Sequence, residues 1–409
     1  MSRTTLALAL AVLSIVLSGC PRPNEMEPFR QPDEPDYGRP LAPGQMALRK
    51  IPPEQYPDFG PGLLNRTGLE EAIRNSLAYL AKPSSHRYFP YLDISHDRAV
   101  RSLEHFLVVL AAVRSPQELN AVIRRDFEVY QSVGWNGRGG VFFTGYYTPI
   151  FDGRRQRDGE FRYPLYRQPP DLLKDPDGIT LGRRTPEGRV VPYYTRREIE
   201  EGGVLDGQEI AWLRDPFEAY VVTVQGSAKL RQADGSMLEL AYAANNGMYY
   251  KSIGQEMIRA GKIKRDQLSL QNLIRHFKAH PDDVARFTRM NDRTVFFKEL
   301  AGGPFGSLNV PVLPYRSLAT DKSVFPRACL AFARTRMPVL RDDGTVSVSP
   351  YAAFSLDQDT GGAIRAAGRA DIYVGIGPSA EAIAGRIGSE GQLYYIFLKE
   401  GVSGTASGN

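Results

Sequence analysis

The sequence predicts a mainly β protein with flanking helices. Segments rich in aromatic and β-branched residues run from residue 141 to 243, and a second set runs from residue 294 to 399. Glycine, proline and aspartate separate these segments, as is typical of strands joined by turns. Helical periodicity precedes each set, and no strand–helix alternation of the kind that builds a parallel sheet is present. The order is therefore helices, strands, helices, strands, without an internal repeat.

The first 19 residues have the features of a secretory signal peptide. Arg3 precedes an apolar run, and small residues follow up to Cys20. Leu17-Ser18-Gly19-Cys20 resembles the bacterial lipoprotein box, in which the cysteine is lipidated and becomes the first mature residue; a signal peptide ending in a chance cysteine is the alternative. Pro21 stands where aspartate would retain a lipoprotein in the inner membrane. We therefore expect an outer-membrane lipoprotein of a Gram-negative bacterium, facing the periplasm.

Residues 20–60 are dense in proline and lack an apolar pattern, which predicts an extended tether. Three amphipathic helices are expected next, in residues 68–82, 96–113 and 115–133, the last with a serine cap and a glutamate three positions on.

Strands are then expected in the segments 141–151, 159–167, 188–195, 219–231 and 236–243, forming a barrel or a sandwich. Helices are expected again in 250–263 and 268–290. The remaining strands are expected in 294–300, 310–319, 328–340, 345–358, 371–376 and 392–399.

Composition sets limits on partners and compartment. The net charge of +5 becomes +4 when Arg3 leaves with the signal, and no Lys/Arg cluster is interleaved with aromatic residues, so nucleic acid is not an expected partner. Cys20 and Cys329 are the only cysteines, and lipidation of Cys20 would leave no disulfide. Cys329 lies in an apolar segment and is expected to be an inert core thiol.

Several short motifs match known site patterns only in part. Residues 375–380 match G-x-G-x-x-A, but no further strand carries the acid that a dinucleotide site needs, so a glycine turn is favoured. His276 and His280 share a helical face without the glutamate of a zincin helix, and exposed helix histidines are favoured over a metal site. Ser227 lacks the second glycine of G-x-S-x-G. No metal and no cofactor are therefore expected.

Carboxylates remain as candidate catalysts. Asp357, Asp359 and Asp371 lie within the segment SLDQDTGGAIRAAGRADIYVGIG. Asp371 directly precedes an apolar strand, and Asp359 precedes Thr-Gly-Gly, whose backbone permits close approach of a ligand. A carboxyl group with a raised pKa can protonate the leaving oxygen of a glycosidic bond.

The same segment resembles the three-aspartate region of the membrane-bound lytic murein transglycosylase A family. Further motifs follow the family's order: TGYYTP from Thr144, EFRYPLYRQP from Glu160, VQGSAKL from Val224, NNGMYYKSIG from Asn245 and VFFKEL from Val295. The resemblance implies a double-psi β-barrel domain plus an inserted second β-barrel domain, with a groove between them for a glycan strand. The expected boundaries are 61–145 and 266–402 for the first domain and 146–265 for the insert.

The family resemblance also implies an activity: cleavage of the β-1,4 bond between N-acetylmuramic acid and N-acetylglucosamine in peptidoglycan, with 1,6-anhydromuramic ends. It assigns the acid/base role to Asp371 and a supporting role to Asp359, and this order could be reversed. Asp357 has a weaker claim. Arg369-Ala370 precede Asp371 where many relatives have aromatic or histidine residues. Candidate sugar-binding residues in the matching motifs are Thr144, Tyr146, Tyr147, Gln225, Ser227, Asn246 and Tyr249.

Two alternatives to this function stay open at the level of sequence. One is a glycan hydrolase on the same scaffold, and the other is a non-catalytic, expansin-like glycan-binding lipoprotein. Glycan strands of peptidoglycan and the outer membrane are the expected partners. Proteins of cell-wall synthesis or division are further candidate partners, which the sequence does not identify.

Overall fold

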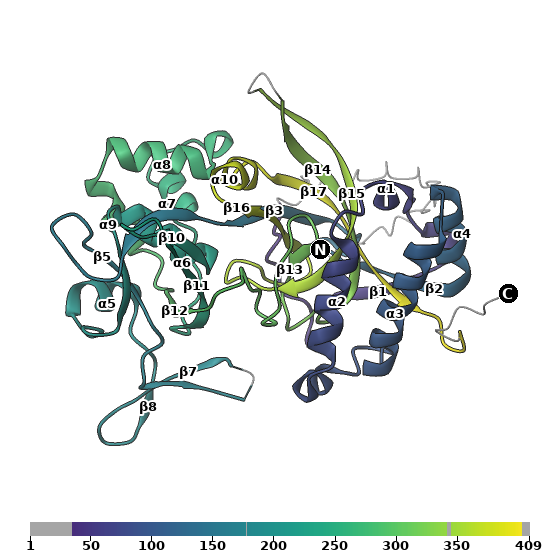
Figure 1. Ribbon diagram of the computed structural model, residues 1–409, viewed down its shortest axis with the longest axis horizontal. Coiled ribbons are helices and arrows are strands. Elements are labelled where there is room, and N and C mark those ends of the chain that lie inside the picture. The colour runs from purple at the N-terminus through teal and green to yellow at the C-terminus, as the bar shows by residue number, and fades with distance from the viewer. Residues whose placement is uncertain (1–34, 177, 342–344, 403–409) are drawn as a thin grey trace, which may run out of the picture. The chain divides into compact units, whose positions relative to one another are not determined.

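The computed structural model describes residues 35–176, 178–341 and 345–402 (Figure 1). The predicted signal peptide 1–19, Cys20 and the first part of the predicted tether lie outside these ranges. No helix within the described residues combines the length and apolar character needed to cross a bilayer.

A closed barrel of six strands forms the first domain. Its strands pair in the circular order β17-β14-β15-β13-β16-β3, and the pairing of β3 with β17 closes the ring. Two of the neighbouring pairs, β13–β15 and β3–β16, are parallel and the others are antiparallel. The strands are β3 Val141–Thr148, β13 Ser317–Ala319, β14 Leu330–Leu340, β15 Val346–Asp359, β16 Arg369–Ile376 and β17 Gly388–Leu398. The predicted mainly β fold with a barrel is confirmed.

Two additional strands extend this sheet beyond β17: β2 (Phe127–Ser132) pairs with β17, and β1 (Leu48–Ile51) pairs with β2. Leu48 and Ile51 are buried. The predicted tether 20–60 is therefore wrong for its last part, because a four-residue edge strand needs too few apolar residues to stand out from a proline-rich background.

Helices pack against the barrel and cover its core. Phe106 of α3 and Phe59 contact Phe354 of β15, with ring centroids 4.9 and 5.9 Å apart respectively. Ser115 caps α4 as predicted, accepting a hydrogen bond from the backbone N–H of Glu118. The helices of this domain are α1 Gly60–Leu64, α2 Leu69–Leu80, α3 His96–Ala112, α4 Pro116–Asp126 and α10 Pro378–Ala384, with 3₁₀ turns at Pro53–Gln55 and Pro83–Tyr88.

A second sheet of six strands follows β3 after Pro149. Its order is β12-β11-β10-β4-β9-β5, and an isolated bridge between Arg167 and Phe297 brings its two edges together. The strands are β4 Ile150–Arg154, β5 Tyr163–Tyr166, β9 Glu209–Leu213, β10 Ala228–Arg231, β11 Met237–Asn245 and β12 Val295–Glu299. Because β12 pairs with β11, the structure extends this domain beyond the boundary predicted at residue 265.

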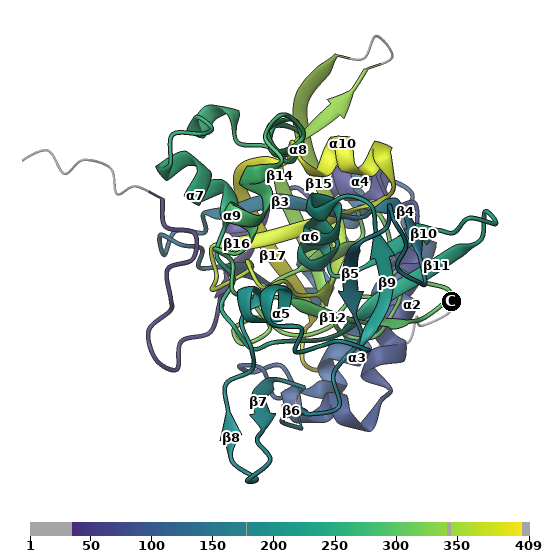
Figure 2. The same cartoon turned by 90° about the vertical axis from the view of Figure 1, so that its left-hand side faces the viewer.

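Helix α6 (Pro216–Gln225) packs against β5, β9 and β12 of the second sheet (Figure 2). Phe217 and Val221 of α6 also join a core formed with the neighbouring helices. The other helices of this domain are α5 Arg196–Gly202, α7 Ile253–Arg259, α8 Leu270–Ala279 and α9 Asp282–Thr288, with a 3₁₀ turn at Arg265–Gln267. A small sheet of β6 Leu172–Lys174, β7 Thr180–Arg184 and β8 Val190–Val191 projects from it (Figure 1).

Candidate functional site

Both predicted aspartates lie in one row that crosses the first barrel. Ala319 of β13 pairs with Asp359 of β15 on one side and with Asp371 of β16 on the other. Asp371 pairs in turn with Thr144 of β3. Directly paired residues on neighbouring strands point to the same face of a sheet. The two carboxyl groups and the Thr144 hydroxyl therefore share one face, with the aspartate Cα atoms two strand spacings, about 10 Å, apart.

The carboxyl group of Asp371 is held by Thr144, whose Oγ1 donates a hydrogen bond to Oδ1. Nε of Arg369 lies 3.8 Å from the same oxygen, and Nη2 of Arg369 donates to Oγ1 of Thr144 at 3.3 Å. Burial raises the pKa of Asp371, and Arg369 and the Thr144 hydrogen bond oppose the rise only in part. A carboxyl group of this kind stays protonated closer to neutral pH than an exposed aspartate does, as a general acid requires.

The carboxyl group of Asp359 accepts three hydrogen bonds. Oδ1 accepts from the backbone N–H groups of Ser307 and Thr360, both at 2.8 Å, and Oδ2 accepts from the phenol of Tyr146 at 2.9 Å. Burial raises the pKa of Asp359, while these donors favour its charged form. The side chain is fixed in orientation, which suits a group that acts through its charge.

Asp357 belongs to a buried ion pair. Nζ of Lys322 donates to Oδ1 of Asp357, and the hydroxyls of Thr320 and Tyr395 also donate to this carboxylate. The Asp357 side chain is fully buried. Burial lowers the pKa of Lys322, and the attraction of Asp357 opposes this. We infer that Asp357 holds β15 in place and does not contact substrate.

The second domain contributes two side chains that the sequence reasoning missed. Tyr250 interacts electrostatically with both Arg369 and Asp371, and burial is the largest cause of its raised pKa. Arg293 lies against the backbone of Gly362, so that a Cβ there would come 2.6 Å from Nε of Arg293. The aspartates therefore lie where the two domains meet. Tyr250 stands beside the predicted Tyr249 in the same motif, but nothing in the local sequence shows which of the two tyrosines faces the site.

The predicted sugar-binding tyrosines of β3 point to opposite faces. Tyr146 lies two residues after Thr144, on the face of the aspartates, and its ring centroid is 5.1 Å from that of Tyr373. Tyr147 is buried on the other face, where its hydroxyl donates to Oε2 of Glu381 at 2.8 Å. Tyr146 therefore joins the aspartates and Tyr147 does not.

Gln225 and Ser227 lie at the junction of the two domains. Oε1 of Gln225 accepts a hydrogen bond from the backbone N–H of Tyr147 at 3.1 Å. The hydroxyl of Ser227 lies 3.2 Å from that of Thr148, which in turn lies 3.1 Å from the hydroxyl of Tyr373. Gln225 and Ser227 thus connect the end of β3 to the region of α6 and β10.

Asn246 and Tyr249 differ sharply in environment. The amide of Asn246 is buried and donates to the carbonyls of Tyr194 and Asp292 at 2.9 and 2.7 Å, while its oxygen accepts from the N–H of Thr294. It is thus occupied by backbone groups. Tyr249 is 87% exposed, so its ring is free to meet a ligand.

The remaining candidates have structural surroundings. His276 is mostly buried and not exposed as predicted, and its Nε2 lies 2.9 Å from Oδ2 of Asp283, whereas His280 is exposed as predicted. Cys329 is buried as predicted, and burial raises the pKa of its thiol. Gly377 has a φ of 80° at the turn from β16 into α10, which a glycine turn predicts. Among the described residues, no group of three or more His, Cys, Asp or Glu side chains could hold a metal ion.

Two family models match the chain. The MltA specific insert domain matches residues 142–298, and the 3D domain matches residues 316–397. The first match covers β3 to β12 and the second covers the strands that carry Asp359 and Asp371.

Curated relatives and solved structures agree with these matches. The membrane-bound lytic murein transglycosylase A of Escherichia coli (strain K12) is 33% identical over 285 residues, 69% of this chain and 72% of that protein. The Vibrio cholerae protein of the same name is 32% identical over 271 residues, 65% and 68% respectively.

Similarity in structure covers more of the chain. The membrane-bound lytic murein transglycosylase from Agrobacterium tumefaciens has a TM-score of 0.72 at 27% identity, covering 86% of this chain and 98% of that one. E. coli MltA with bound chitohexaose has a TM-score of 0.65 at 25% identity, covering 90% and 97%.

Proposed function

Because this chain belongs to the membrane-bound lytic murein transglycosylase A family, we propose that Asp371 acts as both acid and base in its cleavage of peptidoglycan. The chain is a peptidoglycan lytic transglycosylase. It cleaves the β-1,4 bond between N-acetylmuramic acid and N-acetylglucosamine and leaves 1,6-anhydromuramic ends. The observation that supports Asp371 is its largely buried carboxyl group with a raised pKa, held by Thr144 on the face where the two domains meet.

The proposed reaction uses one carboxyl group twice. Asp371 first donates its proton to the bridging oxygen as the bond between that oxygen and the anomeric carbon breaks. The resulting carboxylate then takes the proton of the sugar's own 6-hydroxyl as this oxygen bonds to the anomeric carbon. Asp371 returns to its protonated form, and no water is consumed. Thr144 fixes Oδ1, so we assign the transferred proton to Oδ2.

Asp359 is proposed as a supporting carboxylate. Positive charge develops on the sugar ring in the transition state, and a fixed negative charge on the same face stabilises it. The three donors that hold Asp359 suit this role better than proton transfer, because each favours a carboxylate that stays charged. For substrate contacts we propose Thr144, Tyr146 and Tyr249, with Tyr250 added from the structure.

The released glycan ends test the function. Purified peptidoglycan is digested, and the products are treated with borohydride before mass analysis. We expect 1,6-anhydro ends, which have no reducing group and gain no hydrogen. A hydrolase would instead give reducible ends heavier by one water, and a non-catalytic binding protein would release nothing.

The pH dependence of activity tests the role of Arg369 in positioning and tuning Asp371. Its positive charge lowers the pKa of Asp371, so Arg369→Gln raises this pKa further. A general acid must be protonated in the free enzyme, and activity is lost as the pH rises through its pKa. We expect the alkaline limb of kcat/KM to move to higher pH in Arg369→Gln. Arg275→Gln, an exposed site on α8, is the control; an unmoved limb in Arg369→Gln would contradict the assignment.

Localisation is proposed from the sequence and the family name. Relatives are named membrane-bound, which supports a membrane-associated protein of a Gram-negative bacterium. We propose that lipidated Cys20 anchors the chain to the outer membrane, facing the periplasm. A Cys20→Ala variant is then expected in the soluble periplasmic fraction.

A further inference from the structure

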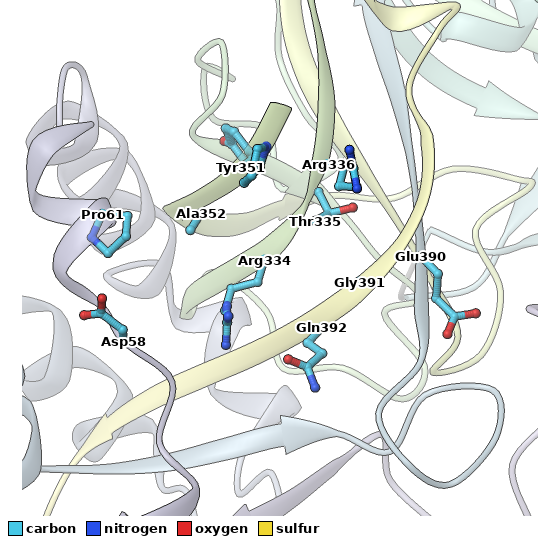
Figure 3. Close-up of a pocket in the computed structure, with 11 residues that line it drawn as sticks. Asp58, Pro61, Arg334, Thr335, Arg336, Tyr351, Ala352, Glu390, Gly391 and Gln392 are labelled. Atoms are coloured by element: carbon cyan, nitrogen blue, oxygen red, sulfur yellow. The ribbon is translucent and has the colours of Figure 1, made fainter. Parts of the chain in front are cut away.

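A cavity of about 560 Å³ lies beside β14 and β17, apart from the aspartates (Figure 3). Arg334 and Arg336 of β14 and Gln392 of β17 line it. Figure 3 shows Asp58 at one end and Glu390 at the other, with Arg334 and Gln392 between them. Its lining thus combines charged and polar side chains with apolar ones such as Pro61, Pro350 and Ala352.

The cavity follows from the way β14 leaves the barrel. β14 pairs with β17 only from Ala331 to Arg334, whereas it pairs with β15 along its whole length. Beyond that point β17 pairs with β3 instead, beginning at Gly391. A Cβ on Gly391 would come 2.1 Å from the carbonyl oxygen of Arg334, so only glycine permits this close approach. β14 and β15 continue as a two-stranded hairpin, and the cavity lies at its base.

The two arginines place cations in the cavity, and Arg334 interacts electrostatically with Asp58 at its end. Arg334 and Arg336 are two residues apart on one strand, so they point to the same face, and both are exposed. Neither forms an ion pair with any residue in the described ranges. Paired guanidinium groups in this arrangement suit the planar, two-oxygen geometry of carboxylates.

The acids at the two ends are held by neutral donors. Oδ1 of Asp58 accepts from the amide of Asn120 at 2.7 Å, and this bond is the largest cause of the lowered pKa of Asp58. Oε2 of Glu390 accepts from Trp135 and Tyr37, both at 3.1 Å. Asp58 therefore keeps a negative charge, and the nearby cation of Arg334 also lowers its pKa. The cavity thus presents cations at its centre and acids at its ends.

The cavity lies within reach of the catalytic row. Gly388 of β17 pairs with Thr144, which pairs with Asp371, so Gly388 continues that row. Glu390 lies two residues further along β17. Glu390 is therefore two strand spacings and two residues away from Asp371. The Cα atoms of Glu390 and Asp371 lie about 12 Å apart along the sheet. A peptide of four or five residues spans about 13–18 Å when extended.

We propose that this cavity binds the carboxylate-bearing peptide attached to the muramic acid of the glycan strand. Arg334 and Arg336 bind its carboxylates, and Asp58 or Glu390 binds its amino group. This inference rests on the proposed function, since it names the part of the peptidoglycan that the catalytic row itself does not contact.

Two glycan substrates test the inference: strands that carry their peptides, and strands from which an amidase has removed them. In Arg334→Gln/Arg336→Gln we expect KM to rise about tenfold on peptide-bearing strands, equivalent to one lost charge-assisted contact. KM on peptide-free strands and kcat on both are expected to stay unchanged. Arg341→Gln, on the same hairpin but outside the cavity lining, is the control and should match the unaltered chain.

Binding of the amidase-released peptides gives a readout that does not depend on catalysis. Calorimetric titration of the full chain should show saturable binding that the double substitution abolishes. Equal KM changes on both substrates, no change on either, or peptide binding that survives the double substitution would each overturn the inference. Inactivity of the unaltered chain on both substrates would refute the proposed function, while the titration would still decide the role of the cavity.

Discussion

Asp371→Asn is expected to lower kcat on purified peptidoglycan about 10³-fold or more while leaving binding to peptidoglycan intact. General acid–base catalysis contributes about 10²–10⁴-fold, and here one group supplies both proton transfers. The amide can still accept the Thr144 hydrogen bond, so the local structure is retained. The release of soluble fragments measures turnover, and co-sedimentation measures binding. Asp359→Asn, the matched control, is expected to lower kcat by a smaller factor. Its amide keeps the shape of the carboxyl group and removes only the supporting charge.

Stability separates loss of chemistry from loss of fold in this variant. The folded-state pKa of Asp371 lies above the unfolded value of 3.8, so the folded protein loses stability as the pH rises from that value through the raised pKa. Asparagine does not ionise, so Asp371→Asn does not lose this stability as the pH rises. Asp371→Asn should therefore melt at a higher temperature than the unaltered chain at pH 7, with the difference shrinking toward pH 4. Full turnover in Asp371→Asn, or a larger loss in Asp359→Asn, would reverse or refute the assignment.

Lys322→Met is expected to lower the free energy of unfolding by about 3–5 kcal/mol. Removing one partner leaves the fully buried carboxylate of Asp357 without its cation, and a broken buried pair typically costs this much. Denaturant unfolding measures the change. Lys298→Met, at an exposed position on β12, is the control and should stay within about 0.5 kcal/mol of the unaltered chain.

Removal of both charges completes the test of the ion pair. Replacing a buried pair by apolar groups is often close to neutral. Lys322→Met combined with Asp357→Leu is therefore expected to be more stable than Lys322→Met alone. If the double variant is less stable than the single one, the pair does not act as a unit. Unchanged stability in Lys322→Met would mean that the pair does not hold β15.

Two segments show where local sequence patterns failed. Residues 127–132 were expected to continue a helix, yet FEVYQS forms β2, because pairing with β17 overrides the helical spacing that precedes it. Residues 219–225 were expected to form a strand, yet they belong to α6. Asp215 caps this helix and Gly226 ends it, and its apolar residues face two cores at once, which removes the amphipathic pattern.

The sequence predicted the site residues that lie in one short segment. It did not predict those that come from segments distant in the chain. Asp359 and Asp371 were identified from one short segment, and the structure places them in one row. Tyr250 and Arg293 come from the other domain, and Lys322 reaches Asp357 from a separate loop. No local pattern indicates such contacts, since they depend on how strands distant in sequence pair. The β-strands from residue 328 onward were predicted as strands, because each contains aromatic and β-branched residues, although β17 begins at Gly388 and not at residue 392.

Digestion of purified peptidoglycan in ¹⁸O-labelled water tests most directly whether the 6-hydroxyl, and not water, attacks the anomeric carbon. The proposed mechanism, in which Asp371 first gives and then takes a proton, predicts 1,6-anhydromuramic ends that contain no ¹⁸O. Reducing ends that carry one ¹⁸O atom each would contradict it and would establish a hydrolase.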